Sequence, residues 1–183
     1  AVDLNAVNGA TTGTVTSSAT TITGTAANVD TALTSNASAA TDSIEGLDAV
    51  NVVLDDPSTA DTQSYAVADV RSVIDLTTGK VTATISTGGV DALKNATTGV
   101  KGTTGNSLTI TITDTGATAA ELNTIDATTD VKVILDPSGT DNPIGVESSS
   151  YSDVLTAFQS SGFTGLSTAP VIVSGNITVA QAN

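Results

Sequence analysis

Two acidic loops carry the residue types in this sequence that are best suited to metal chemistry. The first, LDDPSTAD, contains Asp55, Asp56 and Asp61, and the second, LDPSGTD, contains Asp136 and Asp141. Carboxylates a few residues apart, with hydroxyl and carbonyl oxygens between them, suit calcium, which takes about 6–8 oxygen ligands. Neither loop matches a complete calcium consensus, so solvated turns in which Asp caps its own backbone are the favoured interpretation. A calcium site in these loops is the alternative.

The residue types that the commonest enzyme mechanisms require are missing. The sequence contains no His and no Cys, so neither a Ser-His-acid arrangement nor a cysteine nucleophile is available. A Ser–Lys pair is formally available, but no motif supports it, and the Gly-containing turns lack the phosphate-loop pattern. We therefore expect that the protein is not an enzyme, and a small hydrolase is the last of the alternatives.

The charge balance limits the expected partners. Five basic residues face 19 acidic ones, which gives a net charge of −14. Phosphate binding needs clustered Lys and Arg, so we expect neither nucleic acid nor an anionic membrane surface as a partner. No apolar run approaches the roughly 20 residues of a membrane span, so membrane insertion is not expected.

The hydrophobic residues are small. They make up 39% of the chain, but aromatic residues contribute only 2%. A wide globular core is usually filled with larger side chains, whereas Ala, Val, Ile and Leu suit a thin core in which each layer touches only its neighbours. The composition therefore favours an elongated fold.

Short helical and strand-like patterns alternate along the chain, and a Thr-Thr-Gly-like phrase follows the helical pattern and leads into the next strand. Helices are predicted at residues 25–33, 65–74, 89–96, 118–125 and 151–158. Strands are predicted at residues 14–22, 50–54, 80–85, 108–113, 131–135 and 171–173. Successive strand starts lie roughly 25–40 residues apart, which is the range of solenoid repeats.

Two long segments match each other in order. Residues 50–79 and 131–162 both run from a strand through an Asp-Pro turn and a polar loop to a Tyr-led helix and a closing Gly. Pro starts a turn because it cannot continue a central strand, and Gly can end a helix. The matched pairs Tyr65 and Tyr151, and Ile74 and Phe158, are predicted to be core residues.

These patterns predict an α/β repeat fold. Helices of about two turns are marginal alone and need a sheet to pack on, so we expect an elongated solenoid of parallel strands with short helices on one flank. A compact, doubly wound α/β domain is the alternative. The whole chain, 1–183, is expected to form one segment of about six strand–helix units. Their expected bounds are 14–49, 50–79, 80–106, 107–130, 131–169, and 170–183 continuing into 1–13.

The two ends of the chain read as parts of one such unit. Placed head to tail, NITVAQAN and AVDLNAVNGATTGTV resemble TAAELNTIDATTDVKV, with Leu4-Asn5 in the place of Leu122-Asn123. We therefore expect one period of a longer tandem array, or separate subunits that join end to end. The residues expected at this end-to-end interface are Thr178, Val179, Ala182, Val2, Leu4 and Val7.

Two further patterns have simple explanations. In LTITIT, Leu108, Ile110 and Ile112 should face one side and the Thr residues the other. Thr ladders on flat solenoids can bind ice, but the matching strands carry Asn51 and Lys132 outward, so ordinary Thr β-propensity is favoured. Three Asn-x-Ser/Thr sequons permit glycan attachment without indicating it, at Asn36, Asn95 and Asn176.

The phrases AELNTIDATT and AVDLNAVNGATTGTV, in an acidic, Cys-free chain rich in Thr, Ala and Gly, resemble the tandem repeats of giant bacterial surface proteins of the marine cyanobacterial type. Related repeats occur in phage appendage proteins. The resemblance implies an extracellular or cell-surface structural protein whose repeats build a filament, rod or surface layer with copies of itself or with adjacent repeats. The alternative is a calcium- or glycan-dependent adhesive module of a cell surface or phage appendage.

Overall fold

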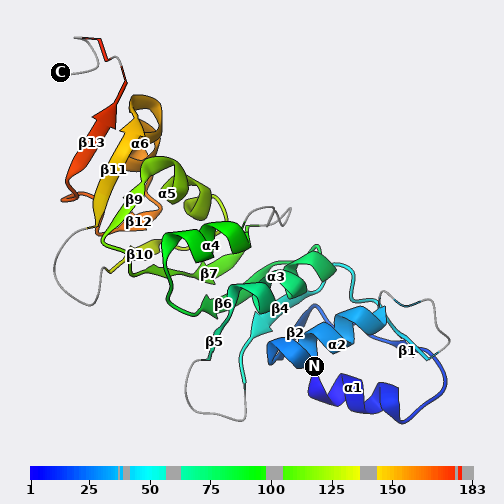
Figure 1. Ribbon diagram of the computed structural model, residues 1–183. Coiled ribbons are helices and arrows are strands. Elements are labelled where there is room, and N and C mark those ends of the chain that lie inside the picture. Colours follow the sequence, from blue (N-terminus) through cyan, green and yellow to red (C-terminus); the bar gives the residue numbers. More distant parts are fainter. Residues whose placement is uncertain are drawn as a thin grey trace. The chain divides into compact units, whose positions relative to one another are not determined.

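The protein has a mixed α/β fold in which short parallel strands alternate with six helices among the described residues (Figure 1). The computed structural model describes residues 1–36, 38, 42–56, 63–97, 105–136, 144–175 and 177–178. The chain falls into two compact units. Unit 1 comprises Ala1–Ser86 and Gly99–Leu108, and unit 2 comprises Thr87–Thr98 and Thr109–Asn183.

Unit 1 contains three helices with strands between them. The helices are α1 (Val2–Gly9), α2 (Ala26–Asn36) and α3 (Val67–Leu76). The strands are β1 (Val15–Thr16), β2 (Thr21–Gly24), β3 (Ile44–Glu45), β4 (Asn51–Leu54), β5 (Ser64–Tyr65) and β6 (Val81–Ile85), and β7 (Ser107–Thr109) pairs with β6. We call a helix and the strands that follow it a coil. Strand β1 pairs with β3, and β2 with β4, both in parallel, so each pairing joins one coil to the next.

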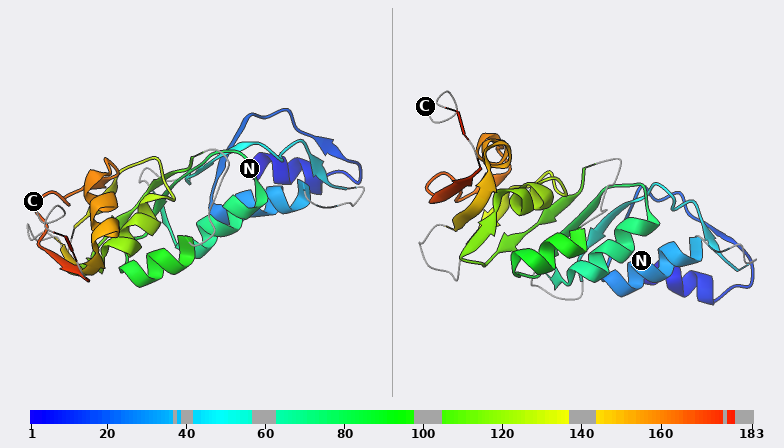
Figure 2. Two further views of the ribbon diagram at one scale, coloured as in Figure 1. Left: turned by 90° about the horizontal axis from the view of Figure 1, so that it is seen from above. Right: turned by 45° about the horizontal axis from the view of Figure 1, so that its top comes forward.

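The third coil of unit 1 also pairs with the coil before it. Strand β6 pairs in parallel with β4 through its first residues and with β5 through its last residues. The helices pack in the same succession, α1 against α2 and α2 against α3, and Figure 2 shows α1 and α2 side by side in dark and lighter blue. Unit 1 is therefore held together by contacts between coils that are consecutive in sequence.

Unit 2 repeats this construction. Its helices are α4 (Val90–Thr97), α5 (Ala119–Asp126) and α6 (Tyr151–Gln159). Its strands are β8 (Thr111–Ile112), β9 (Gly116–Thr118), β10 (Val133–Leu135), β11 (Gly145–Ser150), β12 (Phe163–Thr164) and β13 (Val171–Ser174). They form two parallel three-stranded sheets, β8-β10-β12 and β9-β11-β13, and again each pairing joins consecutive coils.

The core of each unit consists of aliphatic side chains. In unit 1, Val29 and Leu33 of α2 are fully buried, as is Val52 of β4. In unit 2, Leu122 and Ile125 of α5 are fully buried. Each buried side chain of this size stabilises the fold by about 1.5–3 kcal/mol relative to its exposed state. The two Tyr and two Phe residues of the chain all lie outside the fully buried set.

The Thr-Thr-Gly phrase forms a specific turn between a helix and the next strand. After each of α1, α3, α5 and α6, a Thr or Ser oxygen accepts the backbone N–H two residues ahead. The donor–acceptor pairs are Gly13 to Thr11 (3.1 Å), Gly79 to Thr77 (3.0 Å), Val131 to Thr129 (3.1 Å) and Gly162 to Ser160 (2.9 Å). Such local bonds compete with helix continuation, so this sequence motif ends the helix and precedes the next strand.

The five predicted helices are confirmed as α2 to α6, with boundaries shifted by three residues or fewer. The strand prediction was incomplete because it expected one strand for each helix, whereas five of the six described coils carry two or three short strands. The segment 14–22 is split into β1 and β2, and LTITIT is split into β7 and β8. The predicted alternation in LTITIT is confirmed, because Leu108, Ile110 and Ile112 are buried.

The prediction of matched core residues at Tyr65, Tyr151, Ile74 and Phe158 was wrong for three of the four. Ile74 is buried, but Phe158 is 37% exposed and both Tyr side chains are partly exposed. The two Tyr residues also occupy different positions, because Tyr65 precedes the N-cap Ala66 of α3 and Tyr151 follows the N-cap Ser150 of α6. The physical reason is that Ser150 caps α6 two residues earlier relative to the Tyr, with its side chain accepting from the Asp153 N–H.

Candidate functional site

The acidic loops are described only in part. Asp55 and Asp56 follow β4 and are partly exposed, and the Asp55 carboxylate accepts the Asp56 backbone N–H at 2.9 Å. Asp136 follows β10 and is exposed, whereas Asp61 and Asp141 lie outside the described residues. Within the described part of the chain, no three acidic residues gather as a metal site would require. The bond within Asp55-Asp56 fits the capped-turn interpretation, and calcium binding stays a prediction.

Helix α1 has exposed apolar side chains. Val2 is 56% exposed and Val7 is 55% exposed, while Leu4 between them is partly buried. We call these three residues the α1 face; they are the first half of the predicted end-to-end interface. Strands β1 and β2, which follow α1, are each the outer strand of their sheet. Unit 1 therefore presents apolar side chains and two strand edges in its first coil.

The last coil of unit 2 also has exposed apolar side chains and an outer strand. Strand β13 is the outer strand of its sheet, and its Ile172 and Val173 are 63% and 38% exposed. Phe158 of α6 is also exposed. We call Ile172, Val173 and Phe158 the β13 edge. Of the residues predicted for this half of the interface, Thr178 is exposed, and Val179 and Ala182 lie outside the described residues.

The first coils of unit 1 and the last coils of unit 2 are built alike. Asn5 of α1 donates from Nδ2 to the Asn28 carbonyl of the next helix at 2.9 Å. Asn123 of α5 donates from Nδ2 to the Asp153 carbonyl of the next helix at 3.0 Å. The two Leu-Asn pairs that the sequence matched therefore make the same helix-to-helix bond.

A second internal match is found between the turns before β4 and β13. The segments IEGLDAVNVVL, from Ile44, and FTGLSTAPVIV, from Phe163, both contain a Gly-Leu pair. Gly46 and Gly165 both have positive φ, 90° and 94°, which favours glycine. In both segments the carbonyl of the following Leu accepts the N–H three residues ahead, at 3.2 Å and 3.0 Å. Strand β13 is thus the counterpart of β4.

Strands β4 and β13 differ in how they are paired and in how far their side chains are exposed. Strand β4 is paired on both sides, by β2 and by β6, whereas β13 pairs only with β11 among the described strands. Leu54 in β4 is 4% exposed, and its counterpart Val173 in β13 is 38% exposed. The side that the next coil covers in β4 is therefore not covered in β13 by another described strand.

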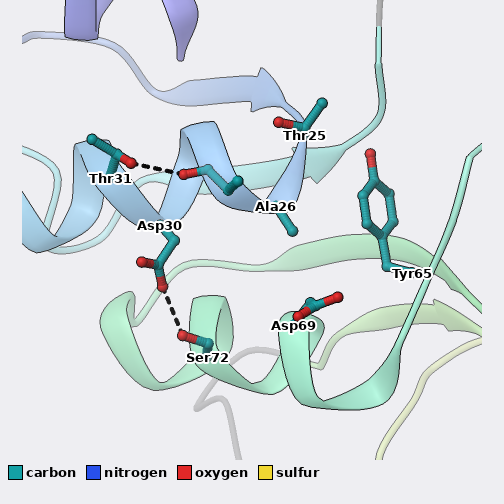
Figure 3. A pocket seen from close by; sticks show the side chains of 8 residues that line it. Thr25, Ala26, Asp30, Thr31, Tyr65, Asp69 and Ser72 are labelled. Carbon is teal, nitrogen blue, oxygen red and sulfur yellow. Dashed lines mark hydrogen bonds between the residues drawn. The ribbon is translucent and has the colours of Figure 1, made fainter.

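A polar groove lies between α2 and α3 in unit 1, with a volume of about 620 Å³. Figure 3 shows Tyr65 at one end and the Asp30–Ser72 pair at the other, with Asp69 of α3 between them. The Ser72 hydroxyl donates to the Asp30 carboxylate at 2.6 Å. The Tyr65 hydroxyl oxygen is enclosed and makes no hydrogen bond. Partial burial, together with the charges of Asp55 and Asp56, raises the pKa of Tyr65, so its hydroxyl stays protonated.

Sequence reasoning missed this groove. Asp30 and Ser72 are separated by 42 residues, and neither belongs to a recognisable motif. The signal available in the sequence was that Tyr65 is one of only two Tyr residues and directly precedes a helix.

An ion pair joins α4 to α5 in unit 2. The Lys94 ammonium lies 2.6 Å from the Glu121 carboxylate and 2.9 Å from that of Asp91. Glu121 also completes a capping box with Thr118 at the start of α5. The hydrogen bond from Lys94 lowers the pKa of Glu121, and bonds to Glu121 and Asp91 raise the pKa of Lys94. This pair therefore links two consecutive helices by charge.

The Glu121→Gln variant should be less stable than the parent chain near neutral pH. The pKa of Glu121 is lowered from 4.5 in the folded chain, so its contribution is present above 4.5 and is lost as the pH falls through the folded pKa. Thermal unfolding midpoints measured from neutral to acidic pH should show the difference between variant and parent shrinking below that value. Asp91→Asn is the control, because its carboxylate contacts the same Lys94 but is 87% exposed. An equal deficit in both variants would contradict the assignment.

Comparison with known proteins found no counterpart, since no family model, no curated protein sequence and no solved structure matches the chain. Among the described residues, no helix is both long enough and apolar enough to cross a membrane. The function has to be inferred from the residues of the chain itself.

Proposed function

We propose that the chain is an extracellular structural protein, a solenoid of six coils that stacks end to end into a filament, rod or surface layer. The observation that carries this proposal is the uncovered β13 edge, whose counterpart β4 is covered by the next coil. The strand pairings with a defined register are all parallel and join consecutive coils, as stacking in a solenoid requires. A compact α/β domain is the alternative fold.

The partner for the β13 edge is the α1 face and first strands of a second copy or of an adjacent repeat. In this arrangement β12 and β13 of one copy pair in parallel with β1 and β2 of the next, and α6 packs against α1. Both surfaces are apolar, and outer strands with unpaired backbone groups readily add a further strand. The contact is head to tail, because the two surfaces differ, and such contacts propagate into filaments.

Charge decides when this association occurs. Each copy carries a net charge of −14, which opposes close approach. Burying the exposed Val and Ile side chains contributes about 1.5–3 kcal/mol for each one that is fully covered. Repulsion between exposed charges is screened within about 8 Å at physiological ionic strength. Association should therefore strengthen as salt is added. The free energy gained from burying apolar side chains stays the same, while the repulsion between the negative charges of the two copies falls.

Sedimentation velocity over a range of protein and salt concentrations tests the proposal. We expect single chains at low salt and a series of larger species, growing with protein concentration, as the salt is raised. Calcium and magnesium at equal concentration should act alike if cations act by screening. A chain that stays monomeric at every concentration and salt would contradict end-to-end stacking, and a response to calcium alone would favour the calcium-dependent adhesive alternative.

A specific observation also favours an adhesive role as the second candidate. The groove beside Tyr65 combines an aromatic ring, carboxylates and hydroxyl groups on the surface of unit 1. A surface filament that carries such grooves at regular intervals would present many identical binding sites, and repeated weak contacts add up to strong attachment.

A further inference from the structure

We propose that the groove between α2 and α3 binds a neutral saccharide. Its wall carries the ring of Tyr65, the carboxylates of Asp30 and Asp69, and the hydroxyls of Thr25, Thr31 and Ser72. The inference does not depend on end-to-end stacking, because all of these residues belong to unit 1 and none belongs to the α1 face or the β13 edge. Its volume, about 620 Å³, lies in the range of small-molecule sites.

Tyr65 supplies an apolar surface. Its ring is partly exposed at one end of the groove (Figure 3), where the apolar face of a pyranose ring can stack on it. Its hydroxyl oxygen is enclosed and out of reach of a ligand, so the ring is the part of Tyr65 that a saccharide contacts.

The carboxylates select the charge of the ligand. Asp30 and Asp69 accept hydrogen bonds from sugar hydroxyls, and bonds to charged acceptors are the strong ones. The described residues that line the groove include no Lys or Arg, so uronic acids and sulfated sugars are repelled. The ligand is therefore neutral and rich in hydroxyl groups.

A divalent cation is the competing occupant, and the geometry disfavours it. The Asp30 carboxylate already accepts the Ser72 hydroxyl at 2.6 Å. The groove lining offers two carboxylates, and no three acidic residues gather anywhere in the described part of the chain. Calcium sites normally use about 6–8 oxygen ligands with several carboxylates among them. An aromatic ring in the wall has no role in such a site.

Saturation-transfer NMR on the full chain, with cellobiose and chitobiose as probes, tests the site. We expect transfer to ring protons of at least one probe, with a dissociation constant on the order of 1 mM. Asp69→Asn should weaken binding about tenfold, the loss expected for one bond to a charged acceptor. Tyr65→Ala removes the stacking ring and should weaken it about fivefold. Tyr151→Ala is the matched control and should bind as the parent does.

Two results would overturn the proposal. One is that neither probe binds the parent chain, or that Asp69→Asn and Tyr65→Ala bind as well as Tyr151→Ala. The other is that calcium at the same concentration displaces the probe from the parent and fails to do so from Asp69→Asn, which would assign the groove to a cation. Asp69 is exposed and Asn has the same shape. The backbone amide spectrum of the Asp69→Asn variant should therefore match that of the parent.

Discussion

Replacing Gly79 with Ala should lower the free energy of unfolding by about 2–3 kcal/mol. Gly79 is buried at the end of the turn that follows α3, and an added Cβ would collide with the backbone carbonyl of Val50 and approach that of Ala49. The turn cannot move away, because Thr77 Oγ1 donates to the Val50 carbonyl at 2.8 Å and accepts the Gly79 N–H at 3.0 Å. Urea unfolding followed by circular dichroism measures the loss.

Gly9→Ala is the matched control for this prediction. Gly9 is the last residue of α1, and an added Cβ would have no neighbour within 4 Å. Because Ala favours a helix more than Gly does, this variant should be as stable as the parent or more so, by up to about 1 kcal/mol. Equal stability of Gly79→Ala and the parent would mean that the turn is not packed against the preceding coil as described.

Charged substitutions at either end should abolish end-to-end association. Val2→Asp with Val7→Asp places two carboxylates on the α1 face, and Ile172→Asp places one at the β13 edge. A carboxylate buried against an apolar surface is strongly disfavoured, so the association constant should fall at least about 100-fold for each variant alone. Light scattering on a sizing column, at a salt concentration where the parent associates, gives the masses.

Mixing the two blocked variants tests the direction of the contact. Each variant keeps one intact surface, so the mixture should form dimers of twice 17.9 kDa and nothing larger. Ala120→Asp, which adds the same charge to an exposed position of α5, should associate as the parent does. Association of either blocked variant with itself would rule out a head-to-tail contact between these surfaces.

The helices were predictable because each carries a local signal. The Thr118 to Glu121 capping box and the apolar spacing of α5 both lie within ten residues of sequence. The Thr-Thr-Gly phrase was equally local, since a Thr side chain and the N–H two residues ahead make the turn without help from elsewhere.

The additional strands of most coils were not predictable, because their stability comes from their neighbours. Strands β3 and β12 have two residues each, too short to show alternation, and β11 reads GVESSS, which is polar. These segments are extended because a parallel partner in the adjacent coil supplies their hydrogen bonds. No local pattern contains that information.

The candidate surfaces were also predictable only in part. The sequence pointed to Val2, Leu4 and Val7 because head-to-tail comparison matches them to α5, and two of the three are exposed as an interface requires. Phe158 was expected in the core, yet its exposure depends on whether another coil follows α6. The groove beside Tyr65 brings together residues from two coils, so only the fold assembles it.

Electron cryomicroscopy of the chain, concentrated at a salt concentration that promotes association, tests the central claim most directly. Stacked strands lie about 4.8 Å apart, so six coils predict filaments that rise about 29 Å for each copy, with the strands perpendicular to the filament axis. A compact domain of 183 residues has a radius of gyration of about 16 Å. Separate particles of that size at every concentration would contradict both the solenoid and its stacking.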